Sequence, residues 1–370
     1  MSRARWANLG FQAGAFVLAL AFTTVILLLA GAQPFQAYVE IIWGSIGSLQ
    51  KFSDVLVAWV PLLLVTAGLL VTFSAGLWNI GVEGQITLGA IFATWCLRLL
   101  QNSGLPTGVL LTAAILAGIV GGAAWALVAG GLKTFGGVNE IFGGLGLNFV
   151  ATALTLYLIF GPWKRPGVGS MSGTEPFPQT LWLPQFAGLR LSPWALGLGI
   201  GAMVVVYLFL QRTYLGLKLK AVGNNARAAF LLGVPTWQHT LLAFALCGAF
   251  AGIAGALQVT AVYHRLIPSI SSGYGFLGLL VAMLIKYRAI WAAPVALFFA
   301  ALNIGSIQLP MVLQIDSSLA GVLQGVLVLS VILVEGGRRR LLEKASGGGR
   351  LSQKPEAMKA RSEPEREVEA

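Results

Sequence analysis

Long apolar runs dominate the chain and alternate with short polar stretches. Most runs hold roughly 20 residues with few charges, the length that a helix needs to cross a hydrocarbon core about 30 Å thick. They are too long and too dense for the strands of a membrane barrel. The ten runs are residues 13–32, 55–74, 80–100, 107–131, 139–161, 193–211, 238–259, 272–285, 290–307 and 318–335. The pattern predicts an all-α, polytopic integral membrane protein with about ten transmembrane helices.

Three polar stretches interrupt or follow these runs. Residues 162–192 are rich in Pro, Gly and Trp, which predicts an ordered outer loop or a short surface helix. Residues 212–236 are basic and are expected on the inner side of the membrane. Residues 337–370 mix charges and hold almost no large apolar side chains, so a disordered cytoplasmic tail is expected. We therefore predict one transmembrane domain over residues 1–336, followed by this tail.

Composition and charge agree with a membrane location. Hydrophobic residues make up 57% of the chain and charged residues 10%, whereas soluble domains carry about a quarter charged residues. The net charge of +11 would suggest nucleic acid as the partner of a soluble protein. Here, an inner N-terminus places twelve Lys and Arg residues inside and six outside before the tail is counted. The positive-inside rule thus explains the charge, predicts both termini in the cytoplasm and leaves no reason to expect nucleic acid.

Polar residues inside the third and fifth runs are spaced as on one face of a helix. Such residues face a neighbouring helix or a wet cavity rather than lipid. Gln85 falls on another side of the third run. The two expected stripes comprise Asn79, Glu83, Thr87 and Thr94, and Glu140, Gly144, Asn148, Thr152 and Thr155. Cys96 and Cys247 form no spacing pattern and are expected to be packing residues rather than a disulfide or a metal site.

The two glutamates leave three roles open. A carboxylate near a helix N-terminus is stabilised by the helix dipole, by free amide groups or by a bond to another helix. Alternatively, Glu83 and Glu140 contact a solute, or they relay motion from the inner surface. With Asn79, Gln85 and Asn148 they are the candidates for a translocation path or gate. No acidic residue lies clearly at the middle of a span, which weighs against an ion or proton relay.

The two halves of the chain also share a weak similarity. SAGLWNIGVEGQITLGAIFATW in the first half resembles SISSGYGFLGLLVAMLIKYRAIW in the second, since each joins a small-residue lead-in to a glycine-containing apolar run and a Trp. Transporters are often built from two related halves around a substrate path. We therefore expect two weakly related halves.

The inner segment carries the most specific pattern. TYLGLKLKAVGNNARAAFLLGV combines basic residues, a predicted loop at GNN and a short predicted helix, ARAAFLL, with Gly233 at its C-cap. The segment resembles the coupling region of permease subunits of bacterial ABC importers of the branched-chain amino acid, ribose and nucleoside type. The residues that fit are Thr213, Gly216, Ala221, Val222, Gly223, Asn225, Ala228, Ala229, Gly233 and Val234.

The stretch GLWNIGVEGQITLGA narrows the resemblance to the simple-sugar and nucleoside branch of these permeases. The similarity covers about residues 10–335, and the length suits the larger of two paired permeases. It implies a multi-pass protein of the bacterial inner membrane, with no cofactor, that moves solute by alternating access. It also implies three protein partners: an ABC ATPase, a second permease in a heterodimer and an extracytoplasmic solute-binding lipoprotein. Of the matching residues, Gly216, Ala221, Gly223, Asn225, Ala228, Ala229 and Gly233 would couple the chain to the ATPase.

The sequence holds no G-x-x-x-x-G-K-[ST] loop, so this chain is not expected to hydrolyse ATP itself. A secondary transporter of a small neutral solute is the main alternative, and it would need a coupling-ion site that no span clearly offers. A membrane enzyme would need paired acids, a His cluster or a nucleophile with its base. Nucleosides are the first choice of solute, followed by simple sugars and then by branched-chain amino acids.

Overall fold

The computed structural model describes residues 17, 20–29, 31, 33–167, 173–285, 289–307 and 309–313, and positions 322, 325–326, 329–330 and 333. Contacts divide the chain into two units, Phe35–Ala320 and a smaller one formed by Met1–Pro34 and Gly321–Ala370. In the smaller unit, residues 20–29 are helical. All features below belong to the larger unit, whose described residues contain helices and no β-strand. The predicted all-helical class is therefore confirmed.

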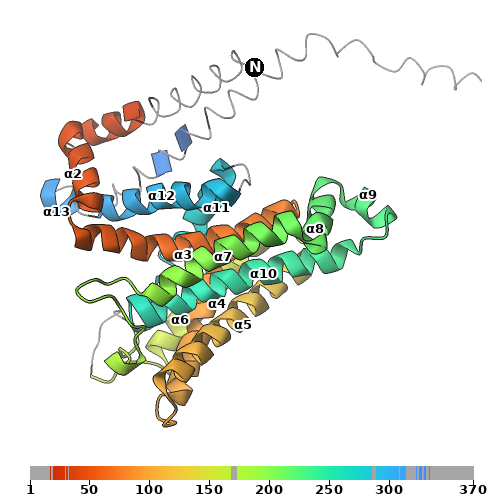
Figure 1. Cartoon of the computed structure of the whole chain (residues 1–370), viewed down its shortest axis with the longest axis horizontal. Helices are drawn as coiled ribbons and strands as arrows, with labels where there is room; N and C mark the ends of the chain where they lie inside the picture. The colour runs from red at the N-terminus through yellow and green to blue at the C-terminus, as the bar shows by residue number, and fades with distance from the viewer. Residues whose placement is uncertain are drawn as a thin grey trace, which may run out of the picture. The chain divides into compact units, whose positions relative to one another are not determined.

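The larger unit is a bundle of helices (Figure 1). The α-helices are α2 Pro34–Ile46, α3 Leu49–Ser74, α4 Val82–Leu100, α5 Thr107–Thr134, α6 Glu140–Phe160, α7 Pro193–Arg212, α8 Tyr214–Asn224, α9 Ala226–Leu231, α10 Thr236–Leu257, α11 Tyr274–Leu284, α12 Ala292–Ser306 and α13 Leu309–Leu313. The short elements are the 3₁₀ turns η1 Gln179–Leu181 and η3 Ala289–Trp291, and the π-helical η2 Gln258–Val262.

Six helical stretches in the described residues are long and apolar enough to cross a membrane. They are Leu49–Ser74, Thr107–Thr134, Glu140–Phe160, Pro193–Arg212, Thr236–Val262 and Ala289–Ser306. Each overlaps one predicted span, so the multi-pass character is confirmed, whereas the count of ten is not. The eighth predicted span corresponds to α11, which has only 11 residues. The first predicted span is described at residues 17, 20–29 and 31, the tenth lies largely outside the described residues, and α2 was not predicted at all.

Helix α3 forms the centre of the bundle. Its side chains from Val60 to Phe73 are all buried, and it contacts α7, α10, α11 and α12. The helix begins at the N-cap Ser48, whose hydroxyl oxygen accepts a hydrogen bond from the Lys51 amide at 3.2 Å. Pro61 lies within the helix and cannot donate to the carbonyl four residues earlier. An apolar helix buried all round is what the uninterrupted run VPLLLVTAGLLV predicts.

Glycines allow α4, α5 and α10 to pack almost backbone to backbone. A Cβ on Gly122 would lie 2.7 Å from the Gly252 Cα, and a Cβ on Gly248 would lie 2.8 Å from the Gly122 carbonyl carbon. Small residues permit this approach, which supplies packing energy where the hydrophobic effect between helices is weak. The glycines at these helix crossings therefore serve dense packing.

Candidate functional site

The predicted coupling segment folds into two short helices, α8 and α9, that project at one end of the bundle (Figure 1). Helix α8 is capped by Thr213, whose hydroxyl accepts a hydrogen bond from the Gly216 amide at 3.1 Å. Gly216 lies against the end of α7, and a Cβ there would lie 2.8 Å from the Leu210 Cα. The Ala221 carbonyl accepts a hydrogen bond from the Asn225 amide at 3.1 Å. The segment is thus ordered rather than a loose basic loop.

The predicted loop at GNN is wrong, because Gly223 and Asn224 complete α8. The turn is instead made at Asn225, an extended residue whose side-chain oxygen accepts from the Ala228 amide at 3.0 Å and so caps α9. The predicted end of α9 is confirmed. Gly233 has a φ of +81°, and the Val234 amide donates back to the Ala229 carbonyl. This left-handed closure is typical of helix C-termini and suits glycine.

Helix α9 exposes an apolar tip that the sequence did not single out. Phe230, Leu231 and Leu232 are 65%, 79% and 83% exposed, whereas Ala229 is buried at 3%. Three consecutive exposed apolar residues at the end of a short helix indicate a surface that contacts something other than water. The signal in the sequence is the run FLL between Arg227 and Gly233. Ala229 therefore fixes α9 to its surroundings, and the three larger residues are available for contact.

Gly223 packs directly against the connection between α3 and α4, residues 75–81. A Cβ on Gly223 would lie 2.8 Å from the Gly76 amide nitrogen, and it would be closer still to the Ser74 carbonyl oxygen. Gly76 itself has a φ of +72°, which favours glycine, and its Cβ position lies 3.0 Å from the Gly223 carbonyl oxygen. The α3–α4 connection, which leads into NIGVEGQ, therefore lies in contact with the last turn of α8.

The predicted stripe on the third span is wrong at its start. Asn79 precedes α4, which begins at Val82, so it does not share a helical face with Glu83 and Thr87. Instead, the Asn79 and Gln85 carboxamides exchange two hydrogen bonds, at 3.0 and 2.9 Å. The Asn79 amide also contacts the Cys247 sulfur at 3.1 Å, on α10. The pairing gives both buried carboxamides hydrogen-bond partners. It therefore determines the position of Asn79, although the four-residue spacing favoured a helical face shared with Glu83.

Of the stripe predicted on the fifth run, Asn148 contacts the start of the neighbouring helix α4. Asn148 of α6 accepts a hydrogen bond from the Gly84 amide at 2.8 Å and donates to the Ile80 carbonyl at 3.0 Å. Gly81 and Gly144 are in contact, since a Cβ added to Gly81 would lie 3.1 Å from the Gly144 Cα. Thr152, placed on the same stripe, is exposed and bonds only to the Asn148 carbonyl. Asn148 therefore fixes the unwound start of α4 to α6.

Glu83 stabilises a helix other than its own. One carboxylate oxygen accepts a hydrogen bond at 3.0 Å from the Phe276 amide, in the first turn of α11. Helix α11 begins at Gly273, whose φ is +74° and which provides no side-chain cap. A Cβ on Gly275 would lie 2.9 Å from the Glu83 carboxyl carbon. The buried carboxylate of α4 thus caps the positive end of α11 across 193 residues of sequence.

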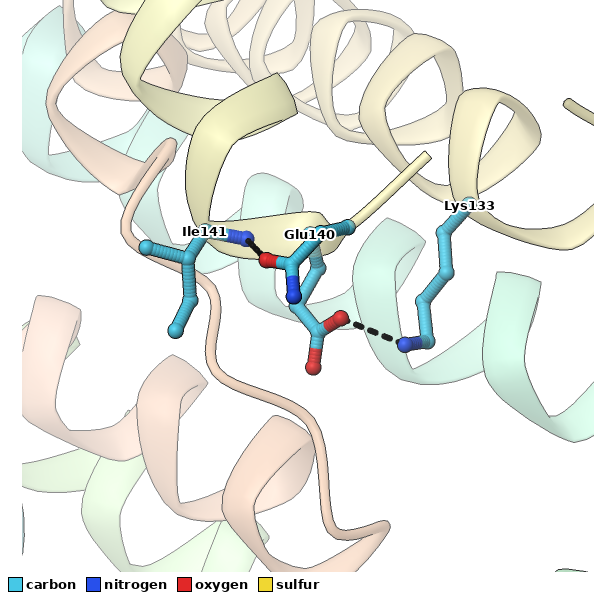
Figure 2. Close-up of polar contacts among 4 residues, drawn as sticks. Lys133, Glu140 and Ile141 are labelled. Carbon is cyan, nitrogen blue, oxygen red and sulfur yellow. Dashed lines mark hydrogen bonds and ion pairs between the residues drawn. The ribbon is translucent and has the colours of Figure 1, made fainter. Parts of the chain in front are cut away.

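Glu140 differs from Glu83, because its partner is a cation. The carboxylate accepts a hydrogen bond from the Lys133 ammonium, near the end of α5 (Figure 2). Beside it, the N-cap Asn139 accepts a hydrogen bond from the Ile141 amide at 2.9 Å. The Lys133 side chain is 30% exposed. Glu140 therefore lies at a helix N-terminus and in an ion pair. Of the three roles considered for it, this is the structural one.

We expect Glu140→Gln to change stability little. An accessible ion pair contributes about 0.2–1 kcal/mol because water competes for both charges. Thermal unfolding of the purified chain, compared with Lys133→Gln and with the double variant, measures this pair. All three should lie within a few degrees of the wild type. A loss of 3 kcal/mol or more in Glu140→Gln would mean that the carboxylate has a second role.

The opposite end of the bundle is closed by residues 173–185. The Phe177 amide donates to the His264 carbonyl at 2.8 Å, and the Leu183 amide donates to the Thr260 carbonyl at 2.9 Å. Trp182 stacks on the His264 ring at 3.7 Å between centroids. Burial lowers the pKa of His264, so at neutral pH the ring stacks in its uncharged form. Within this segment the 3₁₀ turn η1 is the only helical element among the described residues, and the outer location of residues 162–192 stays a prediction.

Cys247 is buried as expected, whereas Cys96 is only half-buried, and both are free thiols. Among the residues that the structure describes, no group of three or more His, Cys, Asp or Glu side chains is placed to hold a metal ion. The site therefore consists of an exposed apolar tip and a helix junction centred on residues 75–85, with residues 173–185 packed at the opposite end. Together with the apolar helices, these features define a multi-pass membrane protein.

The chain belongs to the branched-chain amino acid transport system permease component family, which matches residues 51–332. It is 32% identical to the glucose ABC transporter permease protein TsgB13 of Haloferax volcanii, over 89% of this chain and 88% of that protein. It is 24% identical to the guanosine ABC transporter permease protein NupP of Bacillus subtilis, over 86% and 91% of the two chains. A second guanosine permease of the same organism, NupQ, is 25% identical over 65% and 76%.

Proposed function

We propose that this chain is the membrane-spanning permease subunit of an ATP-driven ABC importer and that it moves a neutral solute by alternating access. Its family and the names of its relatives support this class. The single observation in the structure that supports it best is the exposed apolar tip of α9, held on a capped and ordered segment at one end of the bundle.

The tip is proposed to enter a cleft of the ABC ATPase. Phe230, Leu231 and Leu232 provide the apolar contact, while Asn225 and Gly233 fix the two ends of α9. Gly216 and Gly223 hold α8 against the bundle, and Ala221 bonds the turn at Asn225. Ala228 and Ala229 shape α9 between its caps. In this arrangement, movement of the ATPase would be transmitted to α8 as a rigid displacement.

The α3–α4 connection is proposed to receive that displacement. It touches Gly223 on one side, and through Asn79 and Ile80 it is bonded to α4, α10 and α6. Glu83 continues the chain of contacts to α11. The candidate path and gate residues Asn79, Glu83, Gln85 and Asn148 are therefore proposed to act as a helix junction, with Glu140 as a peripheral ion pair.

The proposed topology follows from the charge distribution. The end that carries α8 and α9 would face the cytoplasm, as would both termini, and residues 162–192 would lie outside. Residues 1–336 would form the permease domain, and residues 337–370 a cytoplasmic tail. Coupling requires this orientation, because ATP is available to the ATPase only in the cytoplasm.

The solute is proposed to be a nucleoside or a simple sugar. The relatives named above are a glucose permease and two guanosine permeases. The buried polar side chains at the junction are mostly carboxamides, and the two candidate carboxylates already have partners. A neutral, hydroxylated solute suits such a protein better than a charged one.

Three protein partners are proposed: an ABC ATPase, a second permease and an extracytoplasmic binding lipoprotein. Two different permeases of Bacillus subtilis carry the guanosine designation, which supports a pair of unlike permeases. ATP hydrolysis would then occur in the partner, and this chain would carry the solute. The main alternative remains a secondary transporter driven by an ion gradient.

Reconstitution separates the two functions. The chain, purified with its ATPase and second permease and placed in liposomes with the lipoprotein, should take up guanosine or D-glucose only with ATP. Uptake that persists without ATP and stops on addition of ionophores would identify a secondary transporter. Competition between the two solutes identifies the preferred class.

The same preparation tests the apolar tip. Leu231→Asp should lose copurification with the ATPase, because a buried unpaired charge at the contact opposes docking. Leu231→Met, which keeps an apolar side chain of similar volume, is the matched control and should retain the complex. Equal copurification by both variants would exclude this surface as the docking site, while leaving the importer class to be judged by uptake.

A further inference from the structure

A small cavity lies toward the end of the bundle opposite to α8 and α9. It has a volume of about 20 Å³ and lies between α3, η2 and the start of α7. Its walls are mostly apolar, and two of the residues that line it are Gln258 and Ser192. Gln258 is 1% exposed and Ser192 is 2% exposed. A cavity of this size has room for one water molecule.

The polar groups of this cavity lack partners. Neither the oxygen nor the nitrogen of the Gln258 carboxamide has a hydrogen bond among the described residues, and the same holds for the Ser192 hydroxyl. The Tyr274 hydroxyl lies near Gln258 but does not meet hydrogen-bond geometry. Buried polar groups are almost always bonded, because leaving one unpaired costs about 1–3 kcal/mol. Gln258 and Ser192, whose three polar side-chain atoms are unpaired, both line this one cavity, and this indicates a bound group.

The backbone contributes to the same site. Gln258 opens the π-helical turn η2, in which the Tyr263 amide bonds the Gln258 carbonyl at 2.8 Å. The extra residue of such a turn changes the direction of the side chains, and π turns occur frequently at functional sites. On α3, Pro61 lacks an amide hydrogen, so the Val57 carbonyl loses its helical donor. Val57 and Pro61 both line the cavity.

The chemistry of the occupant follows from these groups. A carboxamide offers both a donor and an acceptor, a serine hydroxyl offers both, and a carbonyl accepts. A neutral O–H group can satisfy all of them. Arg190 also lines the cavity, but its side chain is 83% exposed and lies 3.9 Å from the Asp54 carboxylate. It therefore faces away from the buried groups and does not make this an anion site.

We propose that Gln258, Ser192 and the Val57 carbonyl form a binding site for a neutral hydroxyl group. Two sources offer this chemistry: a buried water molecule, or a hydroxyl of the transported solute. The solute hydroxyl rests on the proposed transport function, whereas the water molecule does not. Because Pro61 and η2 interrupt two central helices at the same place, the bound hydroxyl would replace the backbone hydrogen bonds that these interruptions remove.

Thermal unfolding of the purified full-length chain tests the site without reference to transport. The variants are Gln258→Leu, Ser192→Ala and the double variant, with Gln258→Met as a second apolar replacement in case leucine prevents folding. If both groups hold one hydroxyl, each single change lowers the Tm by on the order of 2 °C. The double variant then falls by less than the sum, since the first change already releases the shared group.

Additive shifts of either sign would overturn the proposal, and a rise in Tm with each change would indicate a dry cavity. Repeating the series with guanosine or D-glucose distinguishes the sources. A water site gives the same coupling with and without solute. A solute site gives a Tm increase on adding solute to the wild type that Gln258→Leu abolishes. A failure to detect transport would count against the proposed function, but it would not change the Tm comparison of the Gln258 and Ser192 variants.

Discussion

Gly223→Val is expected to abolish solute uptake while the protein remains in the membrane. Gly223 lies against the α3–α4 connection, and its Cβ position is 2.8 Å from the Gly76 amide nitrogen and 2.9 Å from the Ala75 carbonyl carbon. Backbone atoms cannot rotate away as side chains do, so the last turn of α8 must move. The spans lie elsewhere in the bundle and should remain folded. Uptake should fall at least tenfold, since a displacement costing only about 1.4 kcal/mol shifts an equilibrium tenfold.

The measurement compares uptake with the amount of protein in the membrane fraction. Gly197→Val is the matched control, because Gly197 lies in α7 with open space at its Cβ position and a negative φ. Ala229→Asp, which places a charge on the buried side of α9, should also lose uptake. Normal uptake by both coupling variants would contradict the proposed role of this segment. In the reconstituted complex, ATP hydrolysis that continues without uptake would indicate lost coupling rather than lost assembly.

The sequence predicted the long elements well, because their signal is strong and local. The apolar runs beginning at residues 107, 139 and 193 became α5, α6 and α7 with ends shifted by at most a few residues. A membrane requires each such run to satisfy its own backbone hydrogen bonds, so length and hydropathy suffice. Capping residues were similarly local, and Gly233 was identified as a helix terminus for this reason.

The sequence failed where tertiary contacts decide the geometry. The spacing of Asn79, Glu83 and Thr87 favoured one helix, yet the chain stays unwound until Val82 because Asn79 pairs with Gln85. Gly76 and Gly81 were local signals for this break. Similarly, no pattern in the fifth run reveals that Asn148 bonds to the backbone at Ile80 and Gly84.

The weak internal repeat gains a structural meaning from one of these contacts. Glu83 belongs to the first repeat segment. It accepts a hydrogen bond from the amide of Phe276, which belongs to the second. In both segments a glycine with positive φ, Gly76 or Gly273, precedes the helix. The two segments therefore meet at their helix N-termini, the arrangement in which transporters with related halves often place functional residues.

Glu83→Ala is expected to destabilise the helix junction and to reduce uptake strongly. The carboxylate is 6% exposed and supplies the missing cap of α11, so its removal leaves the Phe276 amide and its neighbours unpaired in the protein interior. Losing one buried partner of this kind costs about 1–3 kcal/mol, and more where the lost group is charged. Thermal unfolding of the purified chain and uptake per amount of membrane protein measure the two effects.

Glu83→Gln separates a structural role from solute contact. Glutamine keeps an acceptor for the Phe276 amide but loses the charge that favours the positive end of α11, so Tm and uptake rate should fall less than in the alanine variant. Glu140→Gln is the control, since that carboxylate is held by an accessible lysine. The ratio of guanosine to D-glucose uptake should stay that of the wild type in every Glu83 variant. A changed ratio at unchanged Tm would mean that the carboxylate contacts the solute, and the helix-capping role would then not explain why a charge is kept there.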